Sequence, residues 1–308
     1  MVLGVIGLTG ATGMLGRHLH AALDDAGYAV WPVARTSESS GNSTPWDLNT
    51  WQSDAAFDEI FSGVAAIVHA GALVPGALMP DENVLYDVNV RACANLAQWA
   101  LRRSVPVIFV SGAIVYADTL AGGIVEDAPL GWAWGGYYGF TKLLAEDVWQ
   151  RFRSQGLRVA VLRPSSIYGC GLHSNKIISR FLASARDDGA IDLSPPVDDG
   201  LDLVHAADVA RAVVAVLNRN AWDTFNIGSG GPISLKELAQ ASVDVCGSGY
   251  LQINGTNGDA RLPVTRYGLN SDKAREVLGW SPQIDIRMGL KMMLAGNVAY
   301  KNLAISSR

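Results

Sequence analysis

Short apolar runs alternate with longer stretches of helical periodicity in the first half of the chain. The apolar runs are VLGVIGL (2–8), YAVWPVA (28–34), AAIVHAGA (65–72), VPVIFVSG (105–112) and LRVAVLRP (157–164). Between them, segments such as GRHLHAALDDAG (16–27) and NVRACANLAQWALRR (89–103) repeat apolar residues every three to four positions. Strands that alternate with helices form parallel sheets covered on both faces. The pattern therefore predicts an α/β fold with a doubly wound parallel sheet.

The turn after the first apolar run is rich in glycine. In GLTGATGMLGRHL (7–19), Gly10, Gly13 and Gly16 lie between the first expected strand and the first expected helix. Small residues at such a turn let the backbone approach a pyrophosphate, which faces the positive end of the helix. We therefore expect a bound dinucleotide. Residues between the glycines are expected to contact it too: Thr12, Met14 and Leu15.

The end of the second apolar run bears on the choice of cofactor. It reads Ala34, Arg35, with no acidic residue. An acid at this point commonly binds the ribose 2′-hydroxyl of NAD, whereas an arginine accepts the 2′-phosphate of NADP. A solvated surface arginine is the alternative reading of Arg35, but the missing acid counts separately against tight NAD binding. NADP is the preferred cofactor and NAD the possible one.

The regular alternation weakens after residue 169. A helical segment (176–189) and a proline-rich stretch are followed by a helix (205–218), a strand (223–229) and a mixed tail. We infer a dinucleotide-binding domain formed by residues 1–169 with a return segment, 201–229. A smaller substrate-binding lobe is expected from residues 170–200 and 230–308.

Composition excludes several classes of function. The chain has 308 residues, 49% of them hydrophobic, and a net charge of −5 without a basic run, so nucleic acid and anionic membranes are poor partners. The apolar start is too short to span a membrane and lacks the charged beginning of a signal peptide, so we expect a cytoplasmic protein. Cys93, Cys170 and Cys246 are far apart in sequence, which predicts reduced cysteines and no metal site.

A tyrosine and a lysine stand four residues apart in YYGFTK (137–142). On a helix, Tyr138 and Lys142 share one face, one turn apart, so the ammonium group can favour the phenolate. In an isolated pair with this spacing, the tyrosine more often packs against its neighbours and the lysine more often lies in solvent. The rest of the chain decides between these readings.

Six segments together carry a resemblance to a known family. They are TGATGMLG, YYGFTK, LRPSSIYG, HAADVA, FNIGSG and KAREVLGWSP. In this order they resemble the extended short-chain dehydrogenase/reductase family, which includes nucleotide-sugar epimerases and dehydratases, and the match runs over almost the whole chain. The resemblance implies a Rossmann-type domain that binds NAD(P), with a smaller carboxy-terminal lobe over the substrate.

The resemblance also implies roles for individual residues. Tyr138 would transfer the hydroxyl proton while hydride moves at the adjacent carbon, and its pKa would be lowered by Lys142 and the oxidised nicotinamide. Lys142 would also bind the nicotinamide ribose. The remaining expected cofactor contacts are Asp47 and Leu48 at the adenine, Ala70, Gly71 and Ala72 along the cofactor, Asn89 behind the site, and Pro164, Ser165 and Ser166 near the nicotinamide.

The chain departs from the family pattern at a catalytic position. The family has a serine or threonine four residues before the tyrosine of its VYG-like segment, and here that place, counted from Tyr116, is Gly112. Ser111 is adjacent, and neighbouring strand residues point to opposite faces. Either Ser111 reaches the site through a bulge, as catalytic and substrate-binding residue, or it is structural. We favour the first reading, because the end of a strand distorts readily.

A second departure concerns the substrate diphosphate. Many nucleotide-sugar enzymes of the family have an arginine four residues before the histidine of HVDDVA, and this chain has Leu201. Arg261 and Arg266 in the tail are alternative phosphate ligands, and surface arginines are an equally good reading. Asn175 completes the expected substrate-binding residues.

Three functions remain open from the sequence. The first is a nucleotide-sugar epimerase, which is favoured over a dehydratase because Ala113 and Ile114 replace the acidic residues typical of dehydratases. The second is an NADPH-dependent reductase of a smaller carbonyl compound, favoured by Arg35 and Leu201. The third is a non-catalytic dinucleotide sensor. A homodimer through the helix that carries Tyr138 is what the resemblance implies.

Overall fold

The structure is a computed structural model of the chain. It describes residues 3–36, 43–76, 78–118, 122–132, 135–255 and 267–298.

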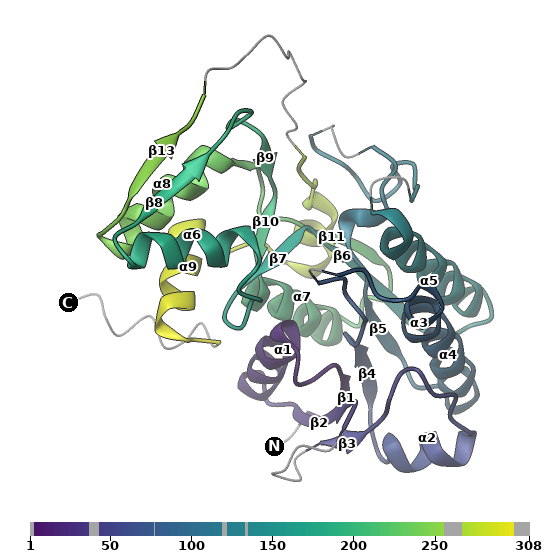
Figure 1. Cartoon of the computed structure of the whole chain (residues 1–308). Helices are drawn as coiled ribbons and strands as arrows, with labels where there is room; N and C mark the ends of the chain where they lie inside the picture. The colour runs from purple at the N-terminus through teal and green to yellow at the C-terminus, as the bar shows by residue number, and fades with distance from the viewer. Residues whose placement is uncertain are drawn as a thin grey trace.

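A parallel sheet forms the centre of the molecule (Figure 1). Every pair of neighbouring strands in it is parallel. Within the described residues it has seven strands, in the order β11 (Thr224–Ile227), β6 (Val159–Pro164), β5 (Val107–Val110), β4 (Ala66–His69), β1 (Val5–Thr9), β2 (Ala29–Ala34) and β3 (Thr44–Pro45). This order, which reverses direction between β1 and β4, is that of a Rossmann-type fold and confirms the expected α/β class.

Helices cover both faces of this sheet (Figure 1). On one face, α1 (Met14–Asp25) and α7 (Ala206–Arg219) bury leucines and valines against β1, β5 and β6. On the other face, α2 (Asp54–Ile60), α4 (Ala92–Arg103) and α5 (Gly136–Ser154) pack tryptophan, phenylalanine and alanine side chains. The central strands β4 and β5 are buried along their whole length, which is why they read as uninterrupted apolar runs.

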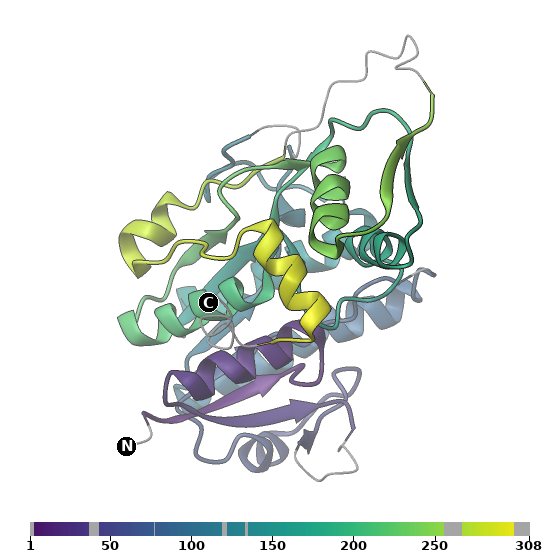
Figure 2. The same cartoon turned by 90° about the vertical axis from the view of Figure 1, so that its left-hand side faces the viewer.

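A smaller lobe lies beside the carboxyl ends of the strands (Figures 1 and 2). Its core joins α6 (Ile177–Arg186), α8 (Leu235–Cys246) and α9 (Ile286–Ala295) through Ile178, Leu182, Leu238 and Leu290. Three short strand pairs complete it: β7 (Ser166–Tyr168) with β10 (Leu203–His205), β8 (Ala190–Leu193) with β13 (Tyr250–Ile253), and β9 (Gly200–Leu201) with β12 (Ile233–Ser234).

The division of the chain between these two parts stays a prediction at the level of residue numbers. The chain returns to the central sheet through α7 and β11. In the tail, Ala274, Leu278 and Trp280 belong to the apolar cluster that α1 and α7 form with the sheet. Among the described helices, none has both the length and the apolar composition that crossing a bilayer requires.

Candidate active site

The glycine turn forms a tight cradle at the carboxyl edge of the sheet. Gly10 has φ +69°, and a Cβ atom there would lie 2.8 Å from the backbone nitrogen of Gly71. A Cβ atom on Gly16 would lie 2.1 Å from the carbonyl oxygen of Gly10. These positions therefore require glycine, for the left-handed conformation at Gly10 and for close backbone approach at Gly16.

The amino-terminal end of α1 opens beside this cradle. Its N-cap, Gly13, provides no side-chain cap, so the first backbone amides of the helix are free to bind an anion. Thr12 and Gly13 are exposed, and Met14 and Leu15 are half-buried. The cradle and the uncapped helix fit the pyrophosphate of a dinucleotide.

The other expected cofactor residues surround the same edge. Leu48 approaches Gly71, since its Cδ1 atom would lie 2.9 Å from a Cβ atom there. Asp47 is exposed next to it, and Arg35 is exposed just beyond the end of β2. The half-buried residues Ala70, Gly71 and Ala72 follow β4 directly. Their roles as cofactor contacts stay predictions.

Asn89 holds the loop after β4 against α5. Its amide nitrogen donates to the carbonyl oxygen of Leu73 at 3.0 Å and to Thr141 at 3.1 Å, and its amide oxygen accepts the backbone N–H of Leu73 at 2.8 Å. It lies in a π-helical turn, Asp87–Arg91, between α3 (Glu82–Tyr86) and α4. Such turns recur at functional sites, and the sequence period did not predict this one.

Tyr138 and Lys142 lie one turn apart in the first half of α5, as expected. The Lys142 side chain is 3% exposed, and its Nζ atom donates to the carbonyl oxygen of Val110 at 2.8 Å. It also lies 4.5 Å from the ring centroid of Phe109. Burial lowers the pKa of Lys142 to about 8, and the charge of Glu146 opposes this change.

The pKa of Tyr138 differs in direction from the sequence expectation. The side chain is half-buried, and burial raises the pKa of Tyr138 to about 12. Since the lysine ammonium is bonded to Val110 instead, it makes no lowering contribution to the pKa of Tyr138. The expected lowering of the Tyr138 pKa by Lys142 is therefore wrong for the protein without its cofactor. The other expected cause of a lower pKa, the positive charge of the nicotinamide, stays a prediction.

Ser111 uses its hydroxyl away from Tyr138. The residue is 7% exposed, and its Oγ atom donates to a carboxylate oxygen of Glu146 at 2.5 Å. Glu146 is two helical turns from Tyr138 along α5. The catalytic role of Ser111 stays a prediction, and this contact counts against it.

Gly112 leaves space on the opposite side of the chain. Its φ of 179° is extended backbone, which any residue adopts. A Cβ atom there would lie 3.8 Å from Ile114 and 4.0 Å from the carbonyl oxygen of Pro164, which are ordinary contacts. Neither the backbone nor the packing therefore requires glycine at this position.

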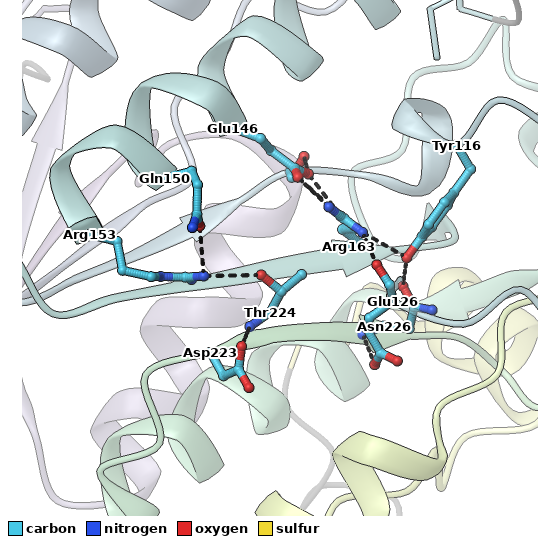
Figure 3. Close-up of polar contacts among 10 residues, drawn as sticks. Tyr116, Glu126, Glu146, Gln150, Arg153, Arg163, Asp223, Thr224 and Asn226 are labelled. Carbon is cyan, nitrogen blue, oxygen red and sulfur yellow. Dashed lines mark hydrogen bonds and ion pairs between the residues drawn. The ribbon is translucent and has the colours of Figure 1, made fainter. Parts of the chain in front are cut away.

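Glu146 and Arg163 form a buried ion pair that sequence reasoning missed (Figure 3). The guanidinium Nη2 donates to Glu146 at 2.6 Å, and Nη1 donates to the hydroxyl of Tyr116 at 3.0 Å. That hydroxyl donates to the side chain of Asn226 at 2.6 Å. In the sequence, Arg163 is a charged residue within an apolar run, and Glu146 follows Lys142 by four residues; these two features could have identified the pair.

The expected nicotinamide residues differ in exposure. Pro164 is buried, Ser166 is exposed, and the Ser165 hydroxyl donates to the buried carboxylate of Asp202 at 2.9 Å. Ser165 therefore joins strands instead of offering a free hydroxyl.

The expected substrate residues lie partly outside the described structure. Asn175 is exposed before α6, and its side-chain oxygen lies 2.8 Å from a ring nitrogen of His173. Leu201 is half-buried in β9. Arg261 and Arg266 are outside the described residues. Within the described ranges, no group of three or more His, Cys, Asp or Glu side chains is placed to bind a metal ion.

Comparison with known proteins agrees with this arrangement. The sequence model of the NAD dependent epimerase/dehydratase family matches residues 6–228. UDP-glucose 4-epimerase of Bacillus subtilis is 26% identical, over 94% of this chain and 94% of the relative. dTDP-glucose 4,6-dehydratase of Streptomyces griseus is 29% identical, over 79% of this chain and 74% of the relative. The structure of UDP-glucose 4-epimerase from Thermus thermophilus in complex with NAD is 20% identical, has a TM-score of 0.79, and aligns over 95% of this chain and 98% of that chain.

The fold and the glycine cradle define a dinucleotide-binding protein of Rossmann type. The chain belongs to the NAD dependent epimerase/dehydratase family, whose model covers most of its length.

Proposed function

We propose that the protein is an NAD(P)-dependent epimerase or oxidoreductase that moves a hydride at a secondary alcohol or ketone carbon of a nucleotide sugar. The observation that carries this proposal is the position of the Tyr138–Lys142 pair. Lys142 is bonded to Val110 at the carboxyl end of β5, and the glycine cradle follows β1 at the same edge of the sheet. The names of the similar curated proteins support the nucleotide sugar as substrate.

The mechanism assigns the proton and the hydride to different groups. The bound nicotinamide supplies hydride transfer. Tyr138 holds the substrate oxygen and removes its proton as the alcohol is oxidised, then returns it as the ketone is reduced. Lys142 would hold the nicotinamide ribose through its ammonium group, from the same face of α5 that carries Tyr138. An epimerase would use one cofactor molecule for both the oxidation and the reduction, so it would retain that cofactor through purification.

Two measurements on the purified protein test this function. Mass spectrometry of the denatured protein identifies the retained cofactor, and chromatography follows the interconversion of UDP-glucose and UDP-galactose. We expect retained cofactor and interconversion that disappears in Tyr138→Phe. An empty site with turnover of NADPH and a small ketone contradicts the epimerase and indicates the second candidate, a carbonyl reductase. The half-buried Leu201, in place of a diphosphate-binding arginine, is the observation that favours that candidate.

The family name supports NAD as the cofactor, and a preference for NADP is our finer proposal. Arg35 is exposed at the end of β2 next to Ala34, in the place where an acid would bind the ribose hydroxyl. A charge-assisted bond to a 2′-phosphate contributes about 1.5 to 3 kcal/mol. Calorimetric titration should therefore give tighter binding of NADP than of NAD, and Arg35→Ala should remove most of the difference. Tighter binding of NAD by the unmodified protein contradicts the preference.

A homodimer through α3 and α5 is also proposed. Val84 and Tyr86 on α3 are 38% and 41% exposed, and Phe140 and Leu144 on α5 are half-buried. Phe140 and Leu144 are four residues apart and lie on one face of α5, and apolar side chains so arranged suit a symmetric helix-to-helix contact. Light scattering should give twice the mass of the chain, and Leu144→Glu should give the monomer. A monomeric wild-type protein contradicts this proposal.

A further inference from the structure

Two consecutive turns of α5 are bonded to two consecutive residues at the end of β5. Lys142 donates to the carbonyl oxygen of Val110 at 2.8 Å, and Glu146 accepts the hydroxyl of Ser111 at 2.5 Å. Because Glu146 follows Lys142 by four residues, both side chains lie on the same face of the helix. The two bonds together fix the register of α5 against the strand, and with it the position of the Tyr138–Lys142 pair.

The same carboxylate also joins α5 to β6. Arg163 donates to it through Nη2 at 2.6 Å and through Nε at 3.1 Å, and both side chains of the pair are less than a tenth exposed. Arg163 is followed directly by Pro164, the first residue expected at the nicotinamide. One buried carboxylate therefore connects the catalytic helix with two strand ends that border the site.

The charge of Glu146 is the second part of the argument. The titratable groups that face Lys142 are His69 from β4, Cys93 from α4 and Glu146 from its own helix. Burial lowers the pKa of His69 to about 3 and raises the pKa of Cys93 to about 12, so both are neutral near pH 7. Two neighbours oppose the effect of burial on the pKa of Lys142, first Cys93 and then Glu146. Because the Cys93 thiol is neutral near pH 7, the lasting electrostatic support for the protonated form of Lys142 comes from the carboxylate of Glu146.

We propose that Glu146 is a positioning residue of the active site, which orients Lys142 beside Tyr138 and keeps it a cation. It acts through Lys142 and does not touch the substrate or cofactor. The proposal rests on the proposed function for its catalytic consequence, but its electrostatic part concerns the protein alone. This role also explains the contact of Ser111, whose hydroxyl donates a hydrogen bond to the carboxylate of Glu146.

Titration of Lys142 by NMR tests the electrostatic part without substrate or cofactor. The chain has six lysines, so the 13Cε signals of lysine-labelled protein are few, and Lys142→Met assigns the one of interest. We expect a midpoint of about 8 in the wild-type protein. In Glu146→Gln, which keeps the shape and an acceptor for Ser111, the midpoint should fall by about one pH unit. The matched control is Asp147→Asn, an exposed carboxylate one residue further along α5, which should leave the midpoint unchanged.

A second variant guards against misfolding of the first. Glu146→Gln leaves Arg163 as a buried cation without its partner, which strongly destabilises many proteins. The double variant, Glu146→Gln with Arg163→Met, removes both charges and should fold, with the Lys142 midpoint still below that of the wild type. A Lys142 midpoint equal to the wild-type value in either folded variant overturns the proposal.

Kinetics with NAD and UDP-glucose test the positioning part. The turnover number of Glu146→Gln should fall about ten- to a hundredfold, since small displacements of catalytic groups have effects of this size. Asp147→Asn should retain wild-type turnover. A Glu146→Gln variant that keeps wild-type turnover overturns the positioning role. If wild-type protein does not turn over UDP-glucose, the proposed function fails, while the NMR midpoints still decide the electrostatic part.

Discussion

Replacing Lys142 with methionine should make the protein more stable while abolishing its activity. The lysine is 3% exposed, and burial lowers its pKa to about 8, so it is a buried cation at neutral pH. Methionine is unbranched and of similar length, so it fills the same space without the charge. Lys142 therefore lowers the stability of the fold.

The size of this cost follows from the pKa values. The ordinary pKa of a lysine, 10.5, is lowered by burial to about 8 in Lys142. At about 1.36 kcal/mol for each pH unit, the charged side chain disfavours folding by about 3 kcal/mol below pH 8. The lost bond to Val110 offsets about 1 kcal/mol of the gain. Lys142→Met should therefore raise the free energy of unfolding at pH 7 by about 2 kcal/mol.

The sign of the pH dependence is fixed by proton binding. Between pH 8 and 10.5 the unfolded chain binds the lysine proton and the folded protein does not. The stability of the wild type should therefore rise with pH across this window, relative to the variant. Burial also raises the pKa of Tyr138, to about 12, but this residue is present in both proteins and cancels in the comparison.

The assay is urea unfolding at several pH values from 7 to 10, followed by tryptophan fluorescence. We expect the advantage of Lys142→Met to be largest at pH 7 and to shrink toward pH 10. Lys291→Met, at an exposed position of α9, is the matched control and should show no such trend. A variant less stable than wild type at pH 7, or a difference independent of pH, refutes the reasoning.

Three further substitutions test individual contacts. Ser111→Ala removes a buried hydrogen bond to a carboxylate, so its free energy of unfolding should fall by about 1 to 3 kcal/mol while its turnover changes less than about tenfold. A fall in turnover of about 10² to 10³ would instead indicate that Ser111 donates to the reacting oxygen. Gly112→Ser should fold with a free energy of unfolding within about 1 kcal/mol of wild type, since its Cβ atom meets ordinary contacts; a much larger destabilisation would contradict this packing. Gly16→Ala should abolish NAD binding in a calorimetric titration, because its Cβ atom would lie 2.1 Å from a backbone oxygen. The control Gly76→Ala, whose Cβ atom would have no atom within 4 Å, should bind NAD normally. Equal binding by both variants would contradict the role of the glycine cradle in binding NAD.

The central sheet was predictable, apart from the two-residue edge strand β3, because its inner strands are buried between helices. β4 and β5 are covered on both faces, and this burial leaves continuous apolar runs in the sequence. The lobe was less predictable, since strands such as β9 and β12 have two residues each and show no period. The π-helical turn at Asp87–Arg91 lies within a continuous helical pattern, and its bonding depends on contacts of Asn89 with a distant loop.

The site was predictable in its residue types and less so in its contacts. The glycine spacing located the cradle because Gly10 has a left-handed backbone conformation and Gly16 lies against the carbonyl oxygen of Gly10 in the same turn. The direction of the Ser111 hydroxyl depends on Glu146, which is 35 residues away in sequence. The pKa of Tyr138 depends on how deeply the side chain is buried, which no local pattern reveals.

The central claim is that Tyr138 moves the proton of the reacting alcohol. It is tested most directly by comparing wild-type protein with Tyr138→Phe, measuring NAD affinity and the single-turnover formation of reduced nicotinamide from UDP-glucose. We predict an unchanged affinity for NAD and a rate of reduction at least about 10² lower in the variant, because only the phenolic proton path is removed. Reduction within a few-fold of the wild-type rate would contradict the account.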